Sequence, residues 1–317
     1  MAKLEEMLMR VFVAGATGAI GRQLVPRLVL AGHEVHAMTR SGSKRSMLEA
    51  WGAVPVIADA LDADQVADVV RKARPHVIVH QLTSIAAVDT RHMARSFAAT
   101  NVLRTIGTDH LLAAGRAAGV GRFIAQSHIV PYARTASALK REDDAFDAAP
   151  VAGMRENQAA MVHLESAVLG ASWTVGVVLR YGWFYGPDTA LAPGSEIFEA
   201  IRTRKFPIVG DGAGVWSFIH VADAAEATVA AVERGRRGIY NVVDDDPAPV
   251  GKWVPELARQ LGAGKPWRVP RLVGRLFVGQ AGVVMMDEIR GASNTKAKGD
   301  LAWQPAHPSW REGLAPA

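Results

Sequence analysis

Short apolar runs alternate with longer amphipathic segments through the first half of the chain. Such runs of valine, isoleucine and alanine are typical of strands that are buried on both faces of a parallel sheet. They lie at residues 11–14, 34–38, 54–58, 76–83 and 122–128. The segments between them have apolar residues at helical spacing, at 22–30, 64–74 and 101–119, and we expect Asn101 to open the last of these helices. The alternation predicts an α/β fold with a doubly wound parallel sheet.

The second half of the chain predicts a return to this sheet and a second, smaller unit. A helix is expected over 154–170, a strand and helix over 217–243, and a helix at about 253–261 after the turn-rich run 244–251. We therefore expect a Rossmann-type domain made of 9–183 plus 217–243. The remaining segments, 184–216 plus 244–317, are predicted to form a C-terminal substrate-binding domain.

A glycine-rich turn follows the first predicted strand. Its sequence, GATGAIG, carries Gly15, Gly18 and Gly21, and a predicted helix and a second strand follow. Glycines at this spacing allow a tight turn, close approach of the backbone to a pyrophosphate, and packing of helix on strand. The helix N-terminus then offers free N–H groups to the anion. We predict a dinucleotide site whose contacts here are Gly15, Thr17, Gly18, Ala19, Ile20 and Gly21.

The end of the second strand indicates which dinucleotide is bound. NAD-binding units place an acidic residue there for the ribose 2′-hydroxyl. This chain has Thr39 followed by Arg40, with Lys44 close behind. A guanidinium binds a 2′-phosphate that a carboxylate would repel. We predict NADPH or NADP as the cofactor, with Arg40 and Lys44 in contact; a solvated basic loop is the alternative interpretation.

Composition excludes several other classes of protein. The 317 residues are 49% hydrophobic and 21% charged, no run of 18 apolar residues occurs, and the first ten residues lack a secretory signal. The net charge of +5 is spread along the chain, which argues against nucleic acid as a partner. There are no cysteines, and the ten histidines show no metal-ligand spacing, so we expect no metal. A cytoplasmic protein without a membrane partner is predicted.

Several segments resemble the extended short-chain dehydrogenase/reductase family, which includes epimerases and dehydratases. The resemblance rests on GATGAIG at 15–21, DALD at 59–62, HVIVHQLT at 76–83, NVLRT at 101–105, RFIAQS at 122–127, LRYGWFYGP at 179–187 and the tail at 296–314. It implies further cofactor contacts at Asp59, Ala60, Leu61, Gln81, Leu82, Thr83, Asn101 and Tyr181. It also implies a small-molecule substrate and, in many members, a homodimer.

The chain departs from this family at the catalytic helix. Members normally carry Tyr-x-x-x-Lys there, with a Glu four residues after the Lys, and the tyrosine is the proton donor. Aligning on Glu165 puts Asn157 at the Tyr position and Met161 at the Lys position, and Tyr-x-x-x-Lys occurs nowhere else. The chain is therefore similar to an atypical member without the usual acid.

Three residues are candidates for the missing catalytic groups. Ser127 or His128 lies where the family places its substrate-binding Ser/Thr, with an ambiguity of about one residue. A histidine titrates near neutrality and is a candidate general acid. Asn157 is a candidate to hold a water or a substrate carbonyl. Each has a purely structural alternative, and Tyr132 is expected to pack rather than react.

The predicted substrate domain is rich in apolar side chains. They include Trp183, Phe184, Ile197, Phe198, Phe206, Trp216, Val283, Val284, Met285 and Met286. Most should be core, yet the composition favours a flat apolar substrate over a sugar nucleotide, unless Arg202, Arg204 and Lys205 bind a diphosphate. We predict an NADPH-dependent ketoreductase, similar to atypical members that act on aromatic polyketides such as angucyclinones. The alternatives are a non-catalytic NADP-binding sensor or scaffold, and a nucleotide-sugar epimerase or dehydratase.

Overall fold

A parallel sheet forms the centre of the molecule. The computed structural model describes residues 8–85, 88–135, 137 and 139–314. Within them the central sheet has seven strands in the order β12-β7-β5-β4-β1-β2-β3, all parallel. The strands are β1 (Arg10–Ala14), β2 (Glu34–Thr39), β3 (Val54–Ile57), β4 (Val77–His80), β5 (Arg122–His128), β7 (Val175–Tyr181) and β12 (Gly238–Val242).

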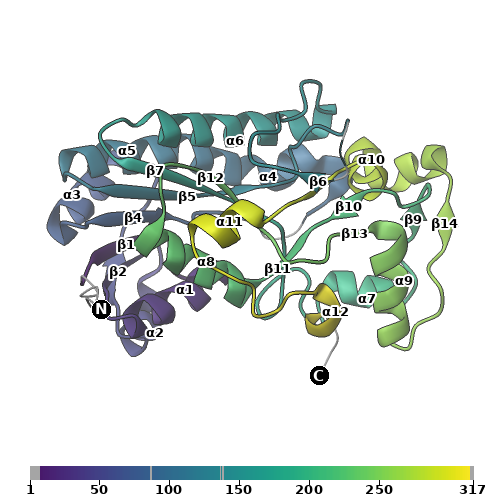
Figure 1. Ribbon diagram of the computed structural model, residues 1–317, viewed down its shortest axis with the longest axis horizontal. Coiled ribbons are helices and arrows are strands. Elements are labelled where there is room, and N and C mark those ends of the chain that lie inside the picture. Colours follow the sequence, from purple (N-terminus) through teal and green to yellow (C-terminus); the bar gives the residue numbers. More distant parts are fainter. Residues whose placement is uncertain (1–7, 86–87, 136, 138, 315–317) are drawn as a thin grey trace.

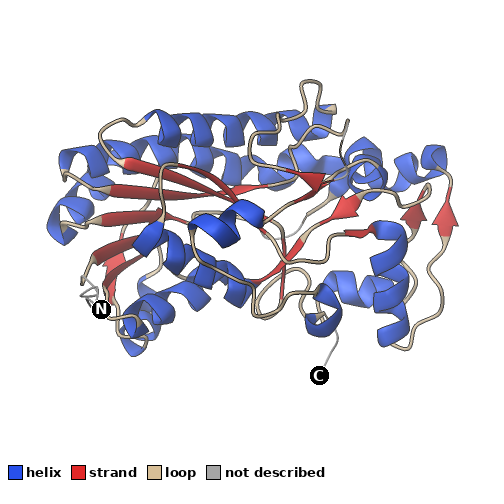
Figure 2. Ribbon diagram, in the orientation of Figure 1, coloured by secondary structure: helices blue, strands red, loops and turns tan. Residues whose placement is uncertain are grey.

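Helices cover both faces of this sheet (Figures 1 and 2). One face is covered by α1 (Ala19–Leu30), α8 (Val221–Arg234) and α11 (Thr295–Asp300), and α2 (Arg45–Ala50) precedes β3. The other carries α3 (Ala63–Ala73), α4 (Met93–Val102), α5 (Thr108–Ala117) and α6 (Ala152–Gly170). This arrangement confirms the predicted doubly wound α/β fold.

Side-chain alternation along β1 joins the two layers. Val11 and Val13 pack into the hydrophobic cluster that α1 and α8 share, whereas Phe12 and Ala14 pack into the cluster of α3, α5 and α6. Successive side chains of a strand point to opposite faces, so a strand between two helical layers must be apolar throughout. This is why the first strand has no polar position after Arg10.

The helix expected to open at Asn101 begins earlier, and that prediction is wrong. A 3-10 turn, Thr90–His92, follows the cap of Asp89 and leads into α4 at Met93. The helical run then passes through a π-helical turn, Leu103–Gly107, into α5. Residues 93–100 contain no glycine or proline, so nothing in them stops a helix. Asn101 lies inside the run rather than capping it.

The C-terminal region packs around a second hydrophobic cluster. Its helices are α7 (Glu196–Arg202), α9 (Val250–Gln260), α10 (Arg271–Asp287) and α12 (Trp310–Gly313). Short strands accompany them: β6 (Leu139–Lys140), β8 (Trp183–Tyr185), β9 (Ile208–Val209), β10 (Val215–Trp216), β11 (Phe218–His220), β13 (Ala248–Pro249), β14 (Arg268–Val269) and β15 (Gly291–Ala292). Phe198, Trp216 and Val283 to Met286 are buried in this cluster as core. The exact division into two domains stays a prediction.

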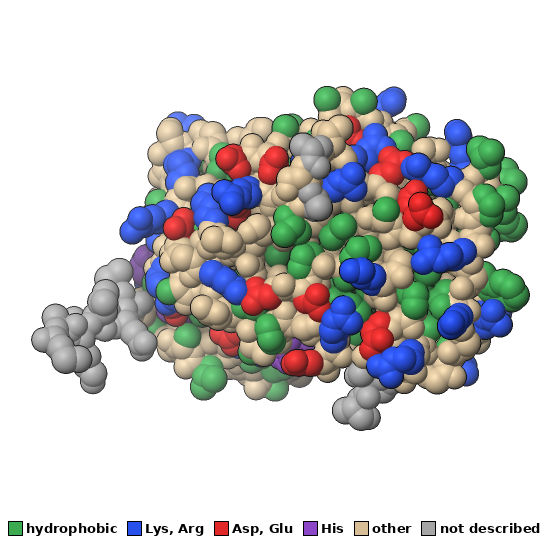
Figure 3. Space-filling view, turned by 45° about the vertical axis from the view of Figure 1, so that its right-hand side comes forward, with side chains coloured by type: hydrophobic (Ala, Val, Ile, Leu, Met, Phe, Trp, Pro, Cys, Tyr) green, Lys and Arg blue, Asp and Glu red, His purple; other side chains and the backbone are tan. Residues whose placement is uncertain are grey.

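The surface of this region combines apolar and basic side chains (Figure 3). The most exposed large apolar residues around α10 are Trp267, Leu272, Leu276 and Phe277. Among the described residues, none of the helices has both the length and the apolar composition to span a membrane.

Candidate cofactor and substrate site

A cavity of about 170 Å³ opens at the carboxyl ends of β1, β2 and β4. From β1 the chain adds β2 and β3 on one side and then β4 on the other side, so the strand order reverses between β1 and β4. Open α/β sheets bind ligands at such switch points. The cavity is lined by Gly15, Thr17, Gly18, Met38, Thr39, Arg40, Ala60, Gln81, Leu82, Thr83 and Leu103. The structure thus brings half of the predicted cofactor residues to one cavity, and Ala19, Ile20, Gly21, Lys44, Asp59, Leu61, Asn101 and Tyr181 do not line it.

The glycine turn forms the floor of this cavity. Gly15 has φ +91, and a Cβ there would lie 2.5 Å from the carbonyl oxygen of Gln81. A Cβ on Gly21 would lie 2.4 Å from the carbonyl oxygen of Ala16. Helix α1 begins at Ala19, with Ile20 and Gly21 in its first turn, which contains no acidic residue and no side-chain cap. The free N–H groups and the positive end of the helix dipole are therefore available to a phosphate.

The end of β2 contributes a cation and no carboxylate. Arg40 is exposed and lines the cavity beside Thr39, whose Oγ1 accepts a hydrogen bond from the backbone N–H of Ser41 at 3.3 Å. Lys44 ends a 3-10 turn, Gly42–Lys44, and does not line the cavity. Of the two predicted basic contacts, the structure places only Arg40 at the site.

Gln81 lines the cavity, and a hydrogen bond to a buried tyrosine fixes its side chain. Its Nε2 donates to the hydroxyl of Tyr181 at 3.1 Å, and that hydroxyl also bonds Thr228 Oγ1 at 2.7 Å. Tyr181 is fully buried in the core, so it supports Gln81 instead of contacting the cofactor as predicted. Gln81 Oε1 is buried without a partner among the described residues, which fits an acceptor for a bound hydroxyl or amide.

The other implied contacts lie around the cavity with different roles. Ala60 lines it, while Asp59 accepts a hydrogen bond from the backbone N–H of Leu61 at 3.0 Å and shapes the turn after β3. Neither Asp59 nor Leu61 lines the cavity. Asn101 Oδ1, like Gln81 Oε1, is buried and unpaired in the part of the chain that the structure describes. Asn101 does not line the cavity, whereas Gln81 Oε1 and the open end of α1 fit a bound dinucleotide.

Ser127 is not placed to bind a substrate oxygen, contrary to the prediction. It is fully buried, and its Oγ donates to Glu165 Oε1 at 2.6 Å. Glu165 also accepts from Arg180 Nε at 2.9 Å and from Nη2 at 2.6 Å. The serine proton is therefore committed to a buried ion pair, and Ser127 is a structural residue.

His128, the next residue along β5, is neutral at physiological pH. Burial, with the nearby charge of Arg104 adding to it, lowers its pKa to about 3. Its Nδ1 faces the backbone N–H of Val130 at 3.1 Å, so the remaining proton of the neutral ring is on Nε2. His128 can donate a hydrogen bond from Nε2, but it does not carry the imidazolium proton expected of a general acid.

The catalytic helix α6 shows what replaces the missing tyrosine and lysine. Asn157 and Met161 are both buried on it. Asn157 Oδ1 accepts from Nη1 of Arg104 at 2.5 Å, which joins α6 to the π-helical turn. Tyr132 is also unsuited as an acid, since burial raises its pKa to about 12 and its hydroxyl donates to Asn241 Oδ1 at 2.8 Å.

Arg104 is a buried charged residue beside Asn157 that the sequence did not single out. It occupies an unspecified position of the NVLRT segment, and the signal was a charged residue in a helix that the fold buries. Its pKa is lowered to about 10 by burial, so it is still a cation at neutral pH.

Aromatic rings border His128 on the side of the C-terminal region. The imidazole of His128 packs edge to face on Trp183, with 5.3 Å between the ring centroids. Trp183 stacks on Trp216, with 3.9 Å between the ring centroids. Trp216 in turn lies 5.1 Å from Trp253. Trp183 is only partly buried, and it presents a flat apolar surface beside the end of β5.

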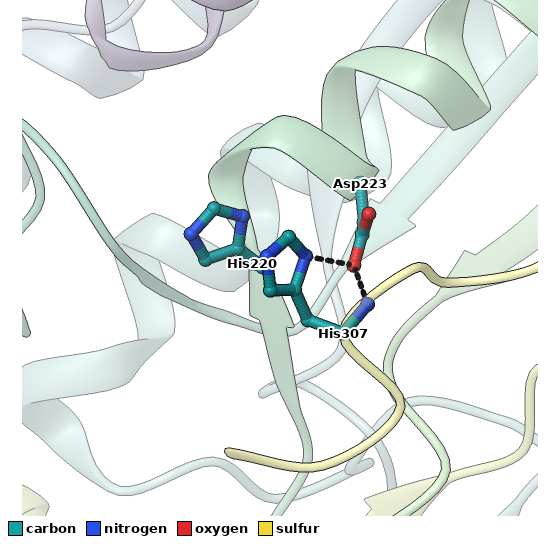
Figure 4. Close-up of side chains that lie close together, drawn as sticks. All are labelled: His220, Asp223 and His307. Carbon is teal, nitrogen blue, oxygen red and sulfur yellow. Dashed lines mark hydrogen bonds and ion pairs between the residues drawn. The ribbon is translucent and has the colours of Figure 1, made fainter. Parts of the chain in front are cut away.

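Two histidines and an aspartate meet elsewhere, at the start of α8 (Figure 4). Metal-ligand spacing could not reveal this cluster, because His307 comes from the tail whereas His220 and Asp223 come from α8 and its cap. Asp223 accepts from the backbone N–H of Ala306 at 3.1 Å and of His307 at 2.8 Å, and from His307 Nδ1 at 3.0 Å. His220 stacks on His307 at 3.8 Å. These bonds fasten the tail to α8.

Comparison with known proteins agrees with this geometry. Residues 11–243 match the NAD dependent epimerase/dehydratase family. A 3-diazoavenalumate denitrifying reductase from Streptomyces sp is 42% identical over 96% of this chain and 99% of its own length. A 4-hydroxy-2-methyl-3-oxo-4-farnesyl-3,4-dihydroquinoline-1-oxide ketoreductase from Stigmatella aurantiaca is 31% identical over 80% of this chain and 74% of its own.

Solved structures share the fold at lower identity. UDP-glucose 4-epimerase from Thermotoga maritima, with UDP-glucose, superposes with a TM-score of 0.74 at 24% identity over 96% of each chain. A Bordetella bronchiseptica enzyme in complex with NAD has a TM-score of 0.75 at 18% identity, covering 99% of this chain and 94% of its own. These structures establish the nucleotide-binding fold.

Proposed function

The chain belongs to the NAD dependent epimerase/dehydratase family and is an NAD(P)-dependent oxidoreductase, and we propose that it is an NADPH-dependent reductase of an aromatic small molecule. When bound, the cofactor supplies a hydride. The side chains of the site would hold the acceptor against the partly buried ring of Trp183, which stacks on the core residue Trp216, and would keep water away. Arg40, at the cavity with no carboxylate beside it, supports NADPH over NADH.

The observation that carries this proposal is that the residues described in the structure place no suitable general acid beside the cofactor cavity. Asn157 and Met161 replace the usual tyrosine and lysine. Ser127 donates to Glu165, and His128 is neutral with a pKa of about 3. A reaction that needs no proton in its chemical step suits such a site.

Hydride transfer to an aryl diazonium group is such a reaction. The hydride brings one electron pair, the bond between carbon and nitrogen breaks, dinitrogen leaves, and a C–H bond remains on the ring. A cation and a hydride give two neutral products, so no proton is required. The similarity to a reductase that is named for a diazo compound supports this acceptor for the present chain.

A ketone is the second candidate, as the sequence predicts. Its reduction produces an alkoxide, and the proton would have to come from water or from a phenol of the substrate. The similarity to a quinoline-oxide ketoreductase supports it.

A nucleotide-sugar substrate has less support. Arg202 pairs with Glu199 at 2.5 Å and Arg204 lies on Trp267 at 4.3 Å, so two of the three basic residues predicted for a diphosphate have other partners.

Reduction assays with defined acceptors test the proposal. The purified protein would be supplied with NADPH deuterated at the transferred position, and with an ortho-hydroxyaryl diazonium salt or the matching aryl methyl ketone. We expect NADPH oxidation, release of dinitrogen and deuterium in the arene by mass spectrometry. The rate should not change between pH 5.5 and 7.5, because no residue loses a catalytic proton in that range.

Other results point elsewhere. Turnover of the ketone alone would favour the second candidate. Tight NADPH binding without oxidation by either acceptor would favour a sensor. Faster reaction with NADH than with NADPH would contradict the role of Arg40.

A further inference from the structure

Arg104 is a buried cation without a counter-ion in the described structure. Only 3% of its surface is exposed. No Asp or Glu oxygen of the described residues lies within 4.0 Å of it, whereas Arg180, the other buried arginine of this region, has Glu165. Its Nη1 donates to the neutral amide of Asn157, and its Nε is buried without a partner. Buried charges in proteins are normally paired, because taking an ion out of water is costly.

The other side chains around Arg104 are neutral. His80 is fixed in a neutral form, since burial and the charge of Arg104 lower its pKa to about 4. Its Nε2 bonds Thr108 Oγ1 at 3.0 Å, and that hydroxyl donates to the carbonyl oxygen of Arg104 at 2.7 Å. His128 is neutral for the same reasons. The positive charge therefore has no local compensation.

The position of Arg104 in the fold puts its charge near residues of the candidate site. It follows Leu103, which lines the cavity, and its charge acts on the histidines that end β4 and β5. Its partner Asn157 occupies the position of the catalytic tyrosine in the family resemblance. It also lies in a π-helical turn, and such turns occur frequently at functional sites. The open end of α1 and Arg40 are the groups proposed to bind the cofactor phosphates, so the missing anion is not needed there.

We propose that Arg104 binds a negatively charged oxygen of the substrate. This inference rests on the proposed function and narrows it: the substrate is an aromatic molecule with an ionised hydroxyl or carboxyl group beside the reducible centre. A guanidinium is suited to this role because it stays charged and offers directed N–H donors. No proton is transferred, and Asn157 orients the guanidinium through Nη1.

Binding measurements separate this site from turnover. Salicylate and benzamide, an anionic and a neutral aromatic probe, would be titrated calorimetrically into the protein saturated with NADP⁺. The variants are Arg104→Met, which removes the charge at similar length, and Arg95→Met, an exposed arginine on α4. We expect Arg104→Met to raise the dissociation constant of salicylate at least tenfold, and that of benzamide less than twofold. Arg95→Met should change neither.

The melting temperature without ligand gives a second measurement. If Arg104 awaits an anion, Arg104→Met should melt at or above the wild-type temperature, because an unpaired buried charge is removed. If Arg104 were only structural, Arg104→Met would melt below the wild-type temperature and would bind salicylate and benzamide more weakly to the same extent. Unchanged salicylate binding in Arg104→Met, or no salicylate binding by the wild type at millimolar concentration, would overturn the proposal. Arg104-dependent salicylate binding without reduction of any acceptor would leave the anion site standing and refute only the reductase.

Discussion

Single side chains decide which cofactor and which proton route the site allows. Arg40 is the clearest case, because it is a guanidinium at the end of β2 where an NAD-binding unit has a carboxylate. Its neighbour Thr39 is neutral and bonded to the backbone of Ser41. The proposed preference for a 2′-phosphate therefore depends on one exposed side chain.

Replacing Arg40 tests that preference directly. Arg40→Ala should weaken NADPH binding about tenfold or more, since a charge-assisted hydrogen bond contributes roughly 1.5–3 kcal/mol, and should leave NADH binding unchanged. Fluorescence titration of both nucleotides measures the effect. Lys44→Ala is the matched control and should change neither, because Lys44 does not line the cavity. Equal weakening of NADPH and NADH would mean that Arg40 does not contact the 2′-phosphate.

At the residue level, signals that lie within one stretch could be read from the sequence, whereas those that depend on side-chain orientation could not. The glycine turn and Arg40 are specified within one stretch of sequence, and the structure brings them to one cavity. Ser127 and His128 differ by one position on β5, and a shift of one residue turns a side chain to the opposite face. Sequence alone could not decide between them. Arg104 and Asn157 are 53 positions apart, and only the packing of two helices brings them together.

At the level of elements, the strand–turn–helix unit depends on two close backbone contacts. Gly15 approaches Gln81 of β4's end, and Gly21 approaches Ala16 across the turn. These contacts set how deeply α1 packs on the sheet, and hence where its N-terminus points. Phosphate binding and packing are thus properties of the same few atoms.

Gly21→Ala should therefore lower both stability and NADPH affinity. The added Cβ would lie 2.4 Å from the Ala16 carbonyl oxygen, so the backbone must shift, at a cost of about 1–3 kcal/mol. Urea unfolding and NADPH titration measure the two effects. Gly42→Ala is the control: a Cβ there meets nothing within 4 Å, and the change should stay within about 0.5 kcal/mol. Equal behaviour of the two variants would refute the close contact.

The boundaries of some elements follow from the local sequence, whereas others depend on contacts with distant parts of the chain. The strands were predictable because valine-rich runs occur where both faces of the sheet are covered. The start of α4 was not, because Asn101 resembles an N-cap and nothing before it distinguishes a helix from a loop. α4 also packs against α6, a contact that no local pattern in the sequence reveals.

At the scale of the whole molecule, hydrogen bonds attach the C-terminal tail to α8. Asp223, at the start of α8, accepts three hydrogen bonds from residues 306 and 307, although 84 positions separate Asp223 from His307. The carboxylate is 2% exposed. This connection joins the C-terminal residues to the helix layer that also holds α1 and the glycine turn.

Breaking this connection should destabilise the whole protein. Asp223→Ala removes the buried acceptor of three part-buried hydrogen bonds, and the expected loss in the free energy of unfolding is about 1–3 kcal/mol. Urea unfolding measures it, and limited trypsin digestion should cut after Arg311 faster than in the wild type. Asp300→Ala removes an exposed acid of the same region and should behave as wild type. Unchanged proteolysis in Asp223→Ala would show that the tail is held by its other contacts.

The π-helical turn at Leu103–Gly107 lets one continuous helix satisfy two partners. An α-helix turns about 100° per residue, so one additional residue rotates everything before it relative to everything after it. Below the turn, α5 presents Leu111 and Ala114 to the sheet; above it, α4 presents Met93 to the C-terminal cluster. The additional residue of the π-helical turn lets α4 and α5 each present its own apolar face to its own partner. It also places Arg104 between α4 and α5, where its side chain is buried and bonded to Asn157 of α6.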